Sequence, residues 1–402
     1  MYIIKRYINY HKHTHYSNIY TPDCLVKPVD YCKRAVELGH KEYFTTEHGY
    51  QGNIFDAYTV CQEYNLKCIY ATEAYYVDNR HEKDKGNYHI CLIAMNENGR
   101  KEINSILSQA NKDGYYYKPR IDLELLLRLT PENVIITTAC IASRLFKDNW
   151  LEAFFMPVYN HFKDRLYLEV QCHNAEVQKE HNKRILQLAK EYGLKIIHAN
   201  DSHYIYPEEK EYRALFIKAK KINYGDEDDF ILDYPDYDTI VERYRTQGIL
   251  NDREIHEALD NTLVFDKAEG IVLDKEFKIP KITKDDSDKV LKKIINKAWL
   301  KERNNIPKEK WKDYIKEIHY EFSMIEKCGM ADYFILDHYI VNKAISDYGA
   351  VLTRTGRGSA VSYYINKLLG LTELDRIWCP IKLYPTRFMT DTRILQSRSL
   401  PD

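Results

Sequence analysis

Three histidines stand at alternate positions near the start of the chain, in the stretch YHKHTHYS: His11, His13 and His15. In an extended strand, side chains two residues apart point to the same face, so the three imidazoles would lie together on one side of a sheet or at the mouth of a barrel. Imidazole is a common metal ligand. The triplet also fits a solvated histidine cluster or the remnant of an affinity tag, so a metal site requires further ligands elsewhere.

Further side chains of metal-binding type end or follow apolar segments of the first 204 residues. They are Asp23, His48 in TTEHG, Glu73 in ATEAY, His89 in NYHI, Cys140 in TTAC, and Asp201 and His203 in NDSHY. With His11 and His13 they form a set of nine, which is too large for one tetrahedral ion and suits two or three clustered ions such as Zn or Mn. Ions about 3.5 to 4 Å apart can hold both oxygens of a phosphate ester undergoing displacement. The predicted chemistry is phosphoester hydrolysis.

The elements that must position these residues alternate between strands and amphipathic helices as far as about Tyr204. The clearest strands are KCIYATEAYYV, YHICLIAM, NVIITTAC, LYLEVQC and KIIHANDSHY, and helices are expected over 28–38 and 180–192, the second capped by Gly193. This alternation predicts βα units in an α/β fold with a largely parallel sheet or barrel, and functional groups at the strand ends. His198 has the opposite strand parity to Asp201 and His203, so we expect it to be packed or hydrogen-bonded.

A charged segment from Lys278, KIPKITKDDSD, is typical of a linker. We therefore expect a first domain over 1–278, with a core of 1–205 and an extension of 206–278, and a second domain over 279–402. In the second, Ile315, Ile318, Phe322 and Ile325 form a helical stripe, and GAVLTRTGRGSAVSYYINKLLG predicts a strand, a glycine loop and a helix.

The glycine loop has the residue types of a phosphate-binding turn. Gly356 and Gly358 permit close backbone approach, Arg357 offers a fork of donors to phosphate oxygens, and Ser359 stands near a helix N-terminus. The loop lacks the GxxxxGK[ST] spacing of a P-loop, which argues against an ATPase. Taken alone, a GRGS turn is more often a plain loop.

Composition restricts the class of protein. The 402 residues are 44% apolar and 30% charged, no apolar run reaches the length of a membrane span, and the first residues lack the apolar core of a signal peptide. Nine cysteines without CxxC spacing are expected to be free thiols. The net charge of −1 excludes a globally basic nucleic-acid binder.

The ordered series HxH with a trailing YS, then TEHG, EAY, YH, AC and NDxHY resembles the polymerase and histidinol phosphatase (PHP) domain. It is similar to the version at the N-terminus of the DNA polymerase III alpha subunit of bacterial and phage C-family polymerases, over essentially the whole chain. The resemblance implies a distorted (βα)7 barrel followed by a mixed α/β partial polymerase palm. The implied metal ligands are His11, His13, Asp23, His48, Glu73, His89, Cys140, Asp201 and His203. The implied activity is a metal-dependent 3′ to 5′ exonuclease, and His15 is read as a neighbouring or surface residue.

The resemblance continues through GMADYFILDHYIV, the glycine loop, KLLGLTELD, PTRFM and RSLPD, which match the start of the palm. There Gly356, Arg357, Gly358 and Ser359 are implied to bind nucleotide phosphates. The family's catalytic aspartate pair follows the segment that matches LPD, so we expect no nucleotide addition by this chain alone and a need for Mg only in the complete palm. Implied partners are a DNA primer-template, dNTP, the downstream polymerase portion and other replisome subunits, in the cytoplasm of a bacterium or phage host.

Three departures from the family pattern occur. Glu47 stands where aspartate is usual before the histidine of TEHG, the loop before Asp23 is longer, and Thr355 replaces a frequent proline. Two alternatives remain open: a stand-alone PHP phosphatase for a small phosphate monoester, and a non-catalytic module that metal ions stabilise.

Overall fold

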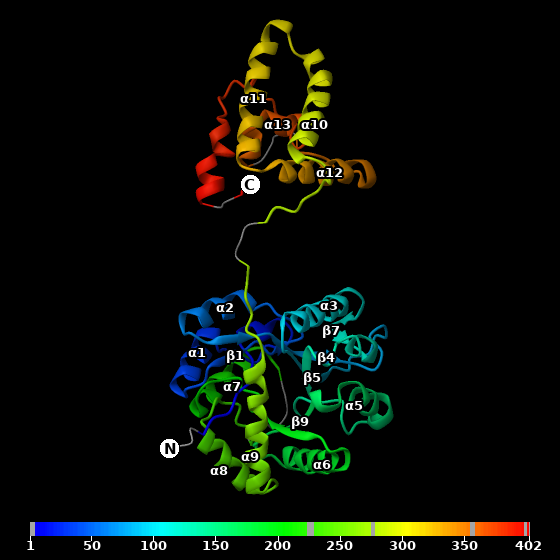
Figure 1. The fold of residues 1–402 in the computed structure, drawn as a ribbon, viewed down its shortest axis with the longest axis vertical. Helices are drawn as coiled ribbons and strands as arrows, with labels where there is room; N and C mark the ends of the chain where they lie inside the picture. The colour runs from blue at the N-terminus through cyan, green and yellow to red at the C-terminus, as the bar shows by residue number, and fades with distance from the viewer. Residues whose placement is uncertain (1–4, 223–228, 275–277, 354–357, 398–399, 402) are drawn as a thin grey trace. The chain divides into compact units, whose positions relative to one another are not determined.

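The chain consists of two compact units, Met1–Leu273 and Asp274–Asp402 (Figure 1). The computed structural model describes residues 5–222, 229–274, 278–353, 358–397 and 400–401. Within these residues, no helix is both long and apolar enough to cross a membrane. All nine cysteines are free thiols, as expected from their spacing.

The first unit is built on a twisted main sheet with the order β10-β9-β8-β5-β4-β7-β6, in which β2 also pairs with β4. Its strands are β2 (Glu47–His48), β4 (Ala71–Tyr76), β5 (Tyr88–Ala94), β6 (Tyr115–Tyr116), β7 (Lys118–Ile121), β8 (Val134–Thr137), β9 (Leu166–Val170) and β10 (Lys195–His198). A separate parallel pair joins β1 (Glu42–Phe44) to β3 (Lys67–Ile69). Most pairings are parallel, but β5 runs antiparallel to both β4 and β8.

The N-terminal segment closes this sheet into a distorted barrel. Lys12 forms an isolated parallel bridge with Ser202, just beyond β10, and the backbone N–H of His13 donates to the Ser202 carbonyl at 2.8 Å. On its other side, the Lys12 N–H donates to Oγ1 of Thr46, between β1 and β2, at 2.9 Å. The segment around Lys12 therefore lies between the first and the last strands, as the expected α/β barrel requires.

Helices cover the outside of the barrel (Figure 1). They are α1 (Pro28–Glu37), α2 (Ile54–Glu63), α3 (Glu97–Asp113), α4 (Leu123–Leu126), α5 (Met156–Phe162), α6 (Glu176–Tyr192), α7 (Lys210–Ala219), α8 (Tyr237–Gln247) and α9 (Asp252–Asn261). Helix α6 ends at Gly193, which adopts the left-handed conformation with φ 66°, as the sequence predicts.

Strand alternation divides the apolar residues of the barrel into two clusters. Ile90 and Leu92 of β5 belong to the large cluster under the helices, whereas Cys91 and Ile93 belong to a smaller cluster that also contains Ala71 and Ile135. Because side chains two apart on a strand share a face, the smaller cluster is the barrel interior. Residues with the parity of Ala71 and Cys91 therefore point inward.

The described part of the second unit is helical, with α10 (Ser287–Glu302), α11 (Trp311–Lys327), α12 (Ala331–Tyr348) and α13 (Tyr364–Leu368) around one apolar core. Ile318 and Ile325 of the expected stripe are buried, whereas Ile315 is 38% exposed. The strand predicted before the glycine loop is wrong for its described residues, since 350–353 have no regular structure. A strand needs a hydrogen-bonded neighbour, and Val351 is 91% exposed.

A buried carboxylate fixes the start of α13, the helix that follows the glycine loop. Glu321 of α11 accepts hydrogen bonds from the backbone N–H groups of Tyr364 and Ile365 at 2.9 and 2.8 Å. Its side chain also accepts from Nε of Arg376 at 2.7 Å. Glu321 thereby joins α11, the start of α13 and the segment that carries Arg376.

Gly99 in the first turn of α3 allows this helix to approach the chain before β8. A Cβ atom at Gly99 would lie 2.1 Å from the carbonyl oxygen of Asn133. We predict that Gly99→Ala lowers the free energy of unfolding by about 1–3 kcal/mol because backbone must shift to admit the methyl group. Urea denaturation measures this. Gly86→Ala is the control, since its Cβ would meet only the end of the Asp84 side chain; equal stability of both variants would contradict the close approach.

Candidate metal centre

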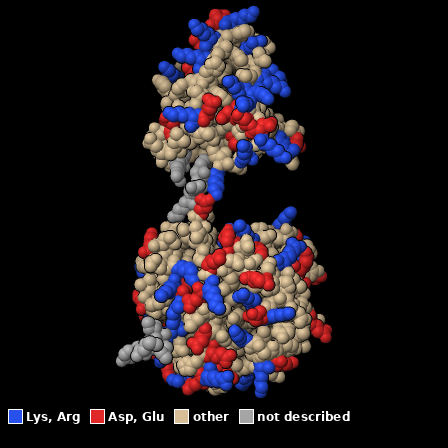
Figure 2. Space-filling model, in the orientation of Figure 1, with Lys and Arg blue, Asp and Glu red and all other residues tan. Residues whose placement is uncertain are grey.

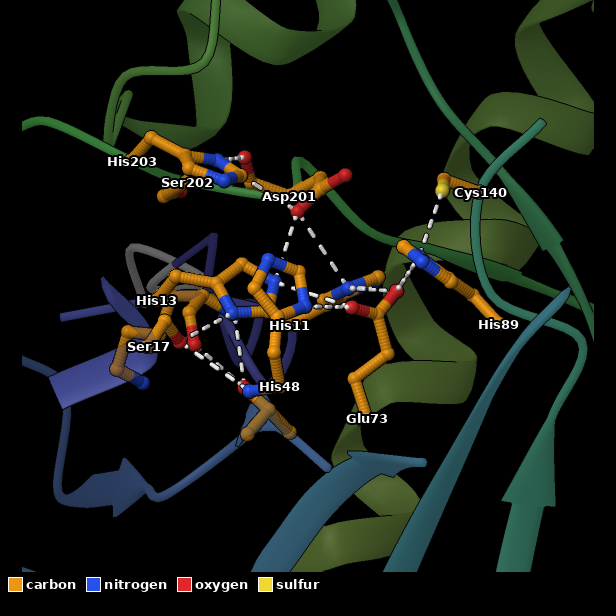
Figure 3. A network of polar contacts seen from close by, with 12 residues as sticks. His11, His13, Ser17, His48, Glu73, His89, Cys140, Asp201, Ser202 and His203 are labelled. Atoms are coloured by element: carbon orange, nitrogen blue, oxygen red, sulfur yellow. Dashed lines mark hydrogen bonds and ion pairs between the residues drawn. The ribbon is translucent and has the colours of Figure 1, made fainter. Parts of the chain in front are cut away.

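The polar residues of the barrel interior gather at one end, where strand parity and the ends of the strands bring them together. Glu73 of β4 and His89 of β5 have the inward parity of Ala71 and Cys91. Asp201 and His203 follow β10, and the segment that carries His11 and His13 pairs with them through Ser202. The close-up in Figure 3 shows these side chains converging from separate elements.

Glu73 lies at the centre of the cluster and is 1% exposed. Its Oε1 lies 2.8 Å from Nδ1 of His89 and 3.2 Å from Nε2 of His11. Its Oε2 lies 2.6 Å from Nδ1 of His48 and 3.5 Å from Nε2 of His13. One carboxylate thus holds together four histidines from three separate segments of the chain.

Asp201 forms the opposite side of the cluster. Its Oδ1 lies 3.4 Å from Nε2 of His11, 3.2 Å from Nε2 of His13 and 3.7 Å from Nδ1 of His203. Its backbone adopts φ 52°, which is uncommon for a residue other than glycine but is visited by aspartate. Backbone strain of this kind gathers at functional sites, where the surrounding structure holds it in place.

Asp23 and Cys140 complete the expected set from the rim. Oδ2 of Asp23 lies 3.2 Å from Nε2 of His203, and Sγ of Cys140 lies 3.8 Å from Nδ1 of His89. The side chain of Asn18 fixes the longer loop before Asp23, because its Oδ1 accepts the backbone N–H of Asp23 at 3.0 Å. All nine residues expected from the sequence therefore lie in one continuous network.

Apart from the close carboxylate–imidazole contacts given above, many potential ligand atoms of this network are buried and make no hydrogen bond within the described part of the chain. They are Nε2 of His11 and His13, both ring nitrogens of His48, Oδ1 of Asp23, Oε2 of Glu73 and Oδ1 of Asp201. Buried polar atoms are otherwise almost always paired. Three overlapping groups have ligand atoms within 4.8 Å of one another: His13, His48 and His203; His11, His13 and Glu73; and His48, Glu73 and His89. Imidazole and carboxylate donors in this arrangement fit clustered divalent metal ions.

The electrostatics of the network favour the ligand forms of several residues. Burial acts to raise the pKa of Glu73, but the surrounding histidines outweigh it and hold that pKa well below its usual range. The pKa of Asp201 is lowered in the same way, against burial, by His11 and its neighbours. Burial and the nearby His13 lower the pKa of His48 to about 4. Metal ions bind carboxylates and neutral imidazoles, and the shifts of Glu73, Asp201 and His48 favour these forms.

The two histidines that the sequence analysis leaves out of the ligand set, His15 and His198, lie outside the network. His15 is partly exposed and lies outside the network, with Nδ1 3.3 Å from the carbonyl oxygen of Val26. His198 is packed outside the barrel interior, with Nδ1 2.9 Å from the hydroxyl of Tyr244.

Within the glycine loop, Gly356 and Arg357 lie outside the described residues. Gly358 adopts φ 73°, and Oγ of Ser359 is buried and has no hydrogen-bond partner among the described residues. The positive φ explains why glycine stands at position 358, since other residues rarely adopt this conformation.

Sequence reasoning missed Glu169, which lies against His11 with Oε1 3.0 Å from Nδ1 of that ring. Glu169 could have been found from parity, because it stands two residues after Tyr167 of the interior cluster, on the same strand β9. The surrounding sequence LYLEVQC is apolar enough that a carboxylate within it requires a buried partner.

Two family models match the chain, one within each unit. Residues 9–173 match the PHP domain, and residues 289–402 match the bacterial DNA polymerase III alpha NTPase domain. The chain is 29% identical to the DNA polymerase III subunit alpha of Aquifex aeolicus, over 99% of this chain and 36% of that protein. It is 24% identical to the DNA-directed DNA polymerase of Bacillus phage SPbeta, over 92% of this chain and 34% of that protein.

Among solved structures, the chain is similar to an amidohydrolase from Chromobacterium violaceum, with 12% identity and a TM-score of 0.36 over 49% of this chain and 88% of that one. The family matches therefore assign a PHP domain to the α/β first unit and a DNA polymerase III alpha NTPase domain to the second. The chain is similar to bacterial DNA polymerase III alpha subunits, and it spans about a third of the length of the curated relatives that it matches.

We predict that the purified chain carries two or three divalent transition-metal ions, and that His13→Ala removes at least one of them. Metal that binds only the folded chain adds to its stability, so the melting temperature of the loaded protein should fall in parallel. Elemental analysis and thermal denaturation measure both effects. His15→Ala is the matched control and should keep the full metal content; wild-type protein never exposed to chelator but holding less than one ion would contradict the prediction.

His198 provides a pH-dependence test away from the network. Burial, followed by the charges of His173 and Arg243, lowers its pKa to about 3. The unfolded chain binds a proton at this residue below about pH 6.5, whereas the folded chain does not, so the stability that the neutral ring confers is lost as the pH falls from 6.5 toward 3. We predict that His198→Gln reduces the slope of unfolding free energy against pH by up to about 1.4 kcal/mol per pH unit. Urea denaturation between pH 6.5 and 4.5 tests this, with the exposed His256→Gln as the unchanged control.

Proposed function

We propose that the first unit is a metal-dependent phosphoesterase that removes nucleotides from the 3′ end of DNA. The observation that carries the proposal is the convergence of nine ligand-type residues, six of which have a buried ligand atom that makes no hydrogen bond within the described residues. In this proposal His11, His13, Asp23, His48, Glu73, His89, Cys140, Asp201 and His203 hold two or three Zn or Mn ions. When bound, such ions polarise phosphoryl oxygens and stabilise the charge of an in-line displacement.

The side chains around the centre define where a phosphate approaches. Glu73 and the two N-terminal histidines are almost fully buried, whereas the side chains of Asp201 and His89 are 15% and 16% exposed. A phosphate ester therefore reaches the centre from the side of Asp201 and His89. The deeply buried residues hold the geometry, and the rim residues meet the substrate.

Lys118 supplies a cation beside this opening. Its Nζ lies 4.2 Å from the centroid of the Tyr75 ring, which in turn stacks on His48 with ring centroids 5.9 Å apart. Nζ also lies 3.3 Å from Oγ1 of Thr21. We propose that Lys118 neutralises a phosphate oxygen of the substrate, as lysine does in many phosphate sites.

The charge distribution supports a polymeric substrate. Residues 274–402 contain 24 Lys and Arg against 18 Asp and Glu, whereas residues 1–273 contain 35 against 42. Figure 2 shows Lys and Arg spread over the visible face of the second unit. A basic unit attracts a polyanion such as DNA, and a phosphatase of small monoesters has no need of it.

For the second unit, we propose the role of the N-terminal part of a polymerase palm, in which Gly356, Arg357, Gly358 and Ser359 bind the phosphates of a nucleotide. The match to the NTPase domain supports this role. The proposed partners are a DNA primer-template, dNTP with Mg, the remaining portion of a replicative polymerase and other replisome subunits. The proposed location is the cytoplasm of a bacterium or of a phage host.

The test of the exonuclease is metal-dependent shortening of a 3′-labelled and a 5′-labelled DNA strand. We predict loss of activity by at least 100-fold in Asp201→Asn and in His203→Ala, since each removes a proposed ligand of the centre. His15→Ala should keep wild-type activity. Equal activity in all variants would reveal a contaminating nuclease, and hydrolysis of histidinol phosphate without any of DNA would establish the small-molecule phosphatase instead.

The role of Lys118 has its own test. We predict that Lys118→Met raises the KM for DNA about tenfold at low salt, because a charged contact to phosphate is lost, while Lys118→Arg keeps most of the affinity. Steady-state cleavage of a short single strand at several salt concentrations measures this. An unchanged KM in Lys118→Met would exclude the phosphate contact without affecting the metal centre.

A further inference from the structure

Two buried carboxylates lie against the metal centre but outside the set of nine expected ligands. They are Glu169 of β9 and Glu47 of β2, each 1% exposed. We infer that they are positioning residues that hold a proton on Nδ1 of the two N-terminal histidines, Glu169 directly on His11 and Glu47 through Ser17 on His13. Both Nε2 atoms are thereby left free to face the ions. This inference rests on the metal centre of the proposed function, but not on DNA as its substrate.

The two ring nitrogens of His11 face different partners. Nδ1 lies 3.0 Å from Oε1 of Glu169, on the side away from the centre. Nε2 lies 3.2 Å from Oε1 of Glu73 and 3.4 Å from Oδ1 of Asp201. Carboxylates face both nitrogens, and an ionised carboxylate only accepts hydrogen bonds. Once ions are bound by Glu73 and Asp201, a neutral ring would keep its proton on Nδ1, toward Glu169, and turn the lone pair of Nε2 toward the ions.

The hydrogen bonds of Glu169 distinguish it from a metal ligand. Its Oε2 accepts from the hydroxyls of Tyr10 at 2.6 Å and Thr137 at 3.2 Å, and its Oε1 accepts from Nε2 of Gln171 at 2.8 Å in addition to His11. His11, Cys91 and Glu169 have ligand atoms close enough to form a metal group of their own. Because donors surround both oxygens of Glu169, the carboxylate is held as an acceptor toward His11.

A relay through one hydroxyl fixes His13. Oγ of Ser17 lies 2.5 Å from Oε2 of Glu47 and 3.1 Å from Nδ1 of His13, and it also accepts the backbone N–H of His48 at 3.2 Å. A serine hydroxyl has a single hydrogen, and the carboxylate of Glu47 can only accept it. Oγ must therefore accept from His13, which places the ring proton on Nδ1.

Further hydrogen bonds hold the carboxylate of Glu47 in place. Its Oε1 accepts from Oγ1 of Thr14 and from Nδ2 of Asn53, both at 2.6 Å. The backbone N–H of Thr14 donates to Oε2 at 3.1 Å. The extra methylene that distinguishes glutamate from the aspartate usual at this position carries the carboxylate to these donors. Carboxylates that orient a metal-bound histidine in this way typically contribute 10- to 100-fold to metal affinity.

The first experiment needs no substitution. In protein with 15N-labelled histidine and loaded with Zn²⁺, ring 15N–1H correlation spectra should show His11 and His13 with the proton on Nδ1 and the metal on Nε2. Assignment uses single His→Gln variants. Either ring bound to zinc through Nδ1 would overturn the inference for that histidine.

The second experiment measures Zn²⁺ affinity and stoichiometry by competition with a chromophoric chelator. We expect Glu169→Gln and Ser17→Ala to weaken binding 10- to 100-fold without a change in the number of ions, and to let the proton of the adjacent ring move between its two nitrogens. Two variants serve as controls. Tyr10→Phe removes one hydrogen bond to Glu169 but leaves the contact between Glu169 and His11, and Ser17→Thr keeps the hydroxyl. The Zn²⁺ affinity of both should stay within about threefold of wild type.

The outcomes separate the possible roles. Loss of one ion per chain in Glu169→Gln would make Glu169 a ligand, and unchanged affinity and ring spectra in both test variants would reduce the two carboxylates to structural roles. A lower melting temperature of the metal-free protein with wild-type affinity would also overturn the inference. Since no DNA is used, absence of exonuclease activity alongside the expected metal results would refute the proposed substrate only.

Discussion

The structure of the first unit depends on the burial of the Glu73 carboxylate among His11, His13, His48 and His89. A buried charge is costly unless it is paired, and these imidazoles come from segments far apart in the sequence. The contacts between the carboxylate and the rings therefore offset the free-energy cost of burying both. The hydrogen bonds of Glu169 and Glu47 extend this arrangement outward and connect it to the strands that make the barrel wall.

The apolar part of the barrel provides the conditions for this cluster. Below the polar end, the interior is filled by residues such as Tyr10, Cys91, Ile93 and Ile135, all at most 1% exposed. Their close packing excludes water and strengthens every electrostatic interaction above them. The antiparallel β5 contributes to both layers, since it presents His89, Cys91 and Ile93 in turn along one face.

The sequence predicted the α/β class, the nine residues of the network and the outward packing of His198, because each depends on local spacing and strand parity. It did not predict Glu169 or the relay through Ser17, since these depend on which strands become neighbours. Strand β9 is a neighbour of the segment of His11 in the closed barrel, although the two are about 160 residues apart in sequence. In the second unit, the apolar run around Val351 resembled a strand, but strand formation depends on a pairing partner that the run itself does not encode.

The closure of the barrel by Lys12 and Ser202 also determines when the site can form. Ligands at positions 11 and 203 are separated by 192 of the 273 residues of the first unit (203 − 11), so the contacts between them are of very long range in sequence. During synthesis at about 5–20 residues per second, His11 emerges from the ribosome roughly 10–40 s before its partners in NDSHY. Throughout that interval the nascent chain exposes histidines and a carboxylate that the finished barrel encloses. A complete set of ligands therefore exists only once the N-terminal segment has paired with the chain beyond β10.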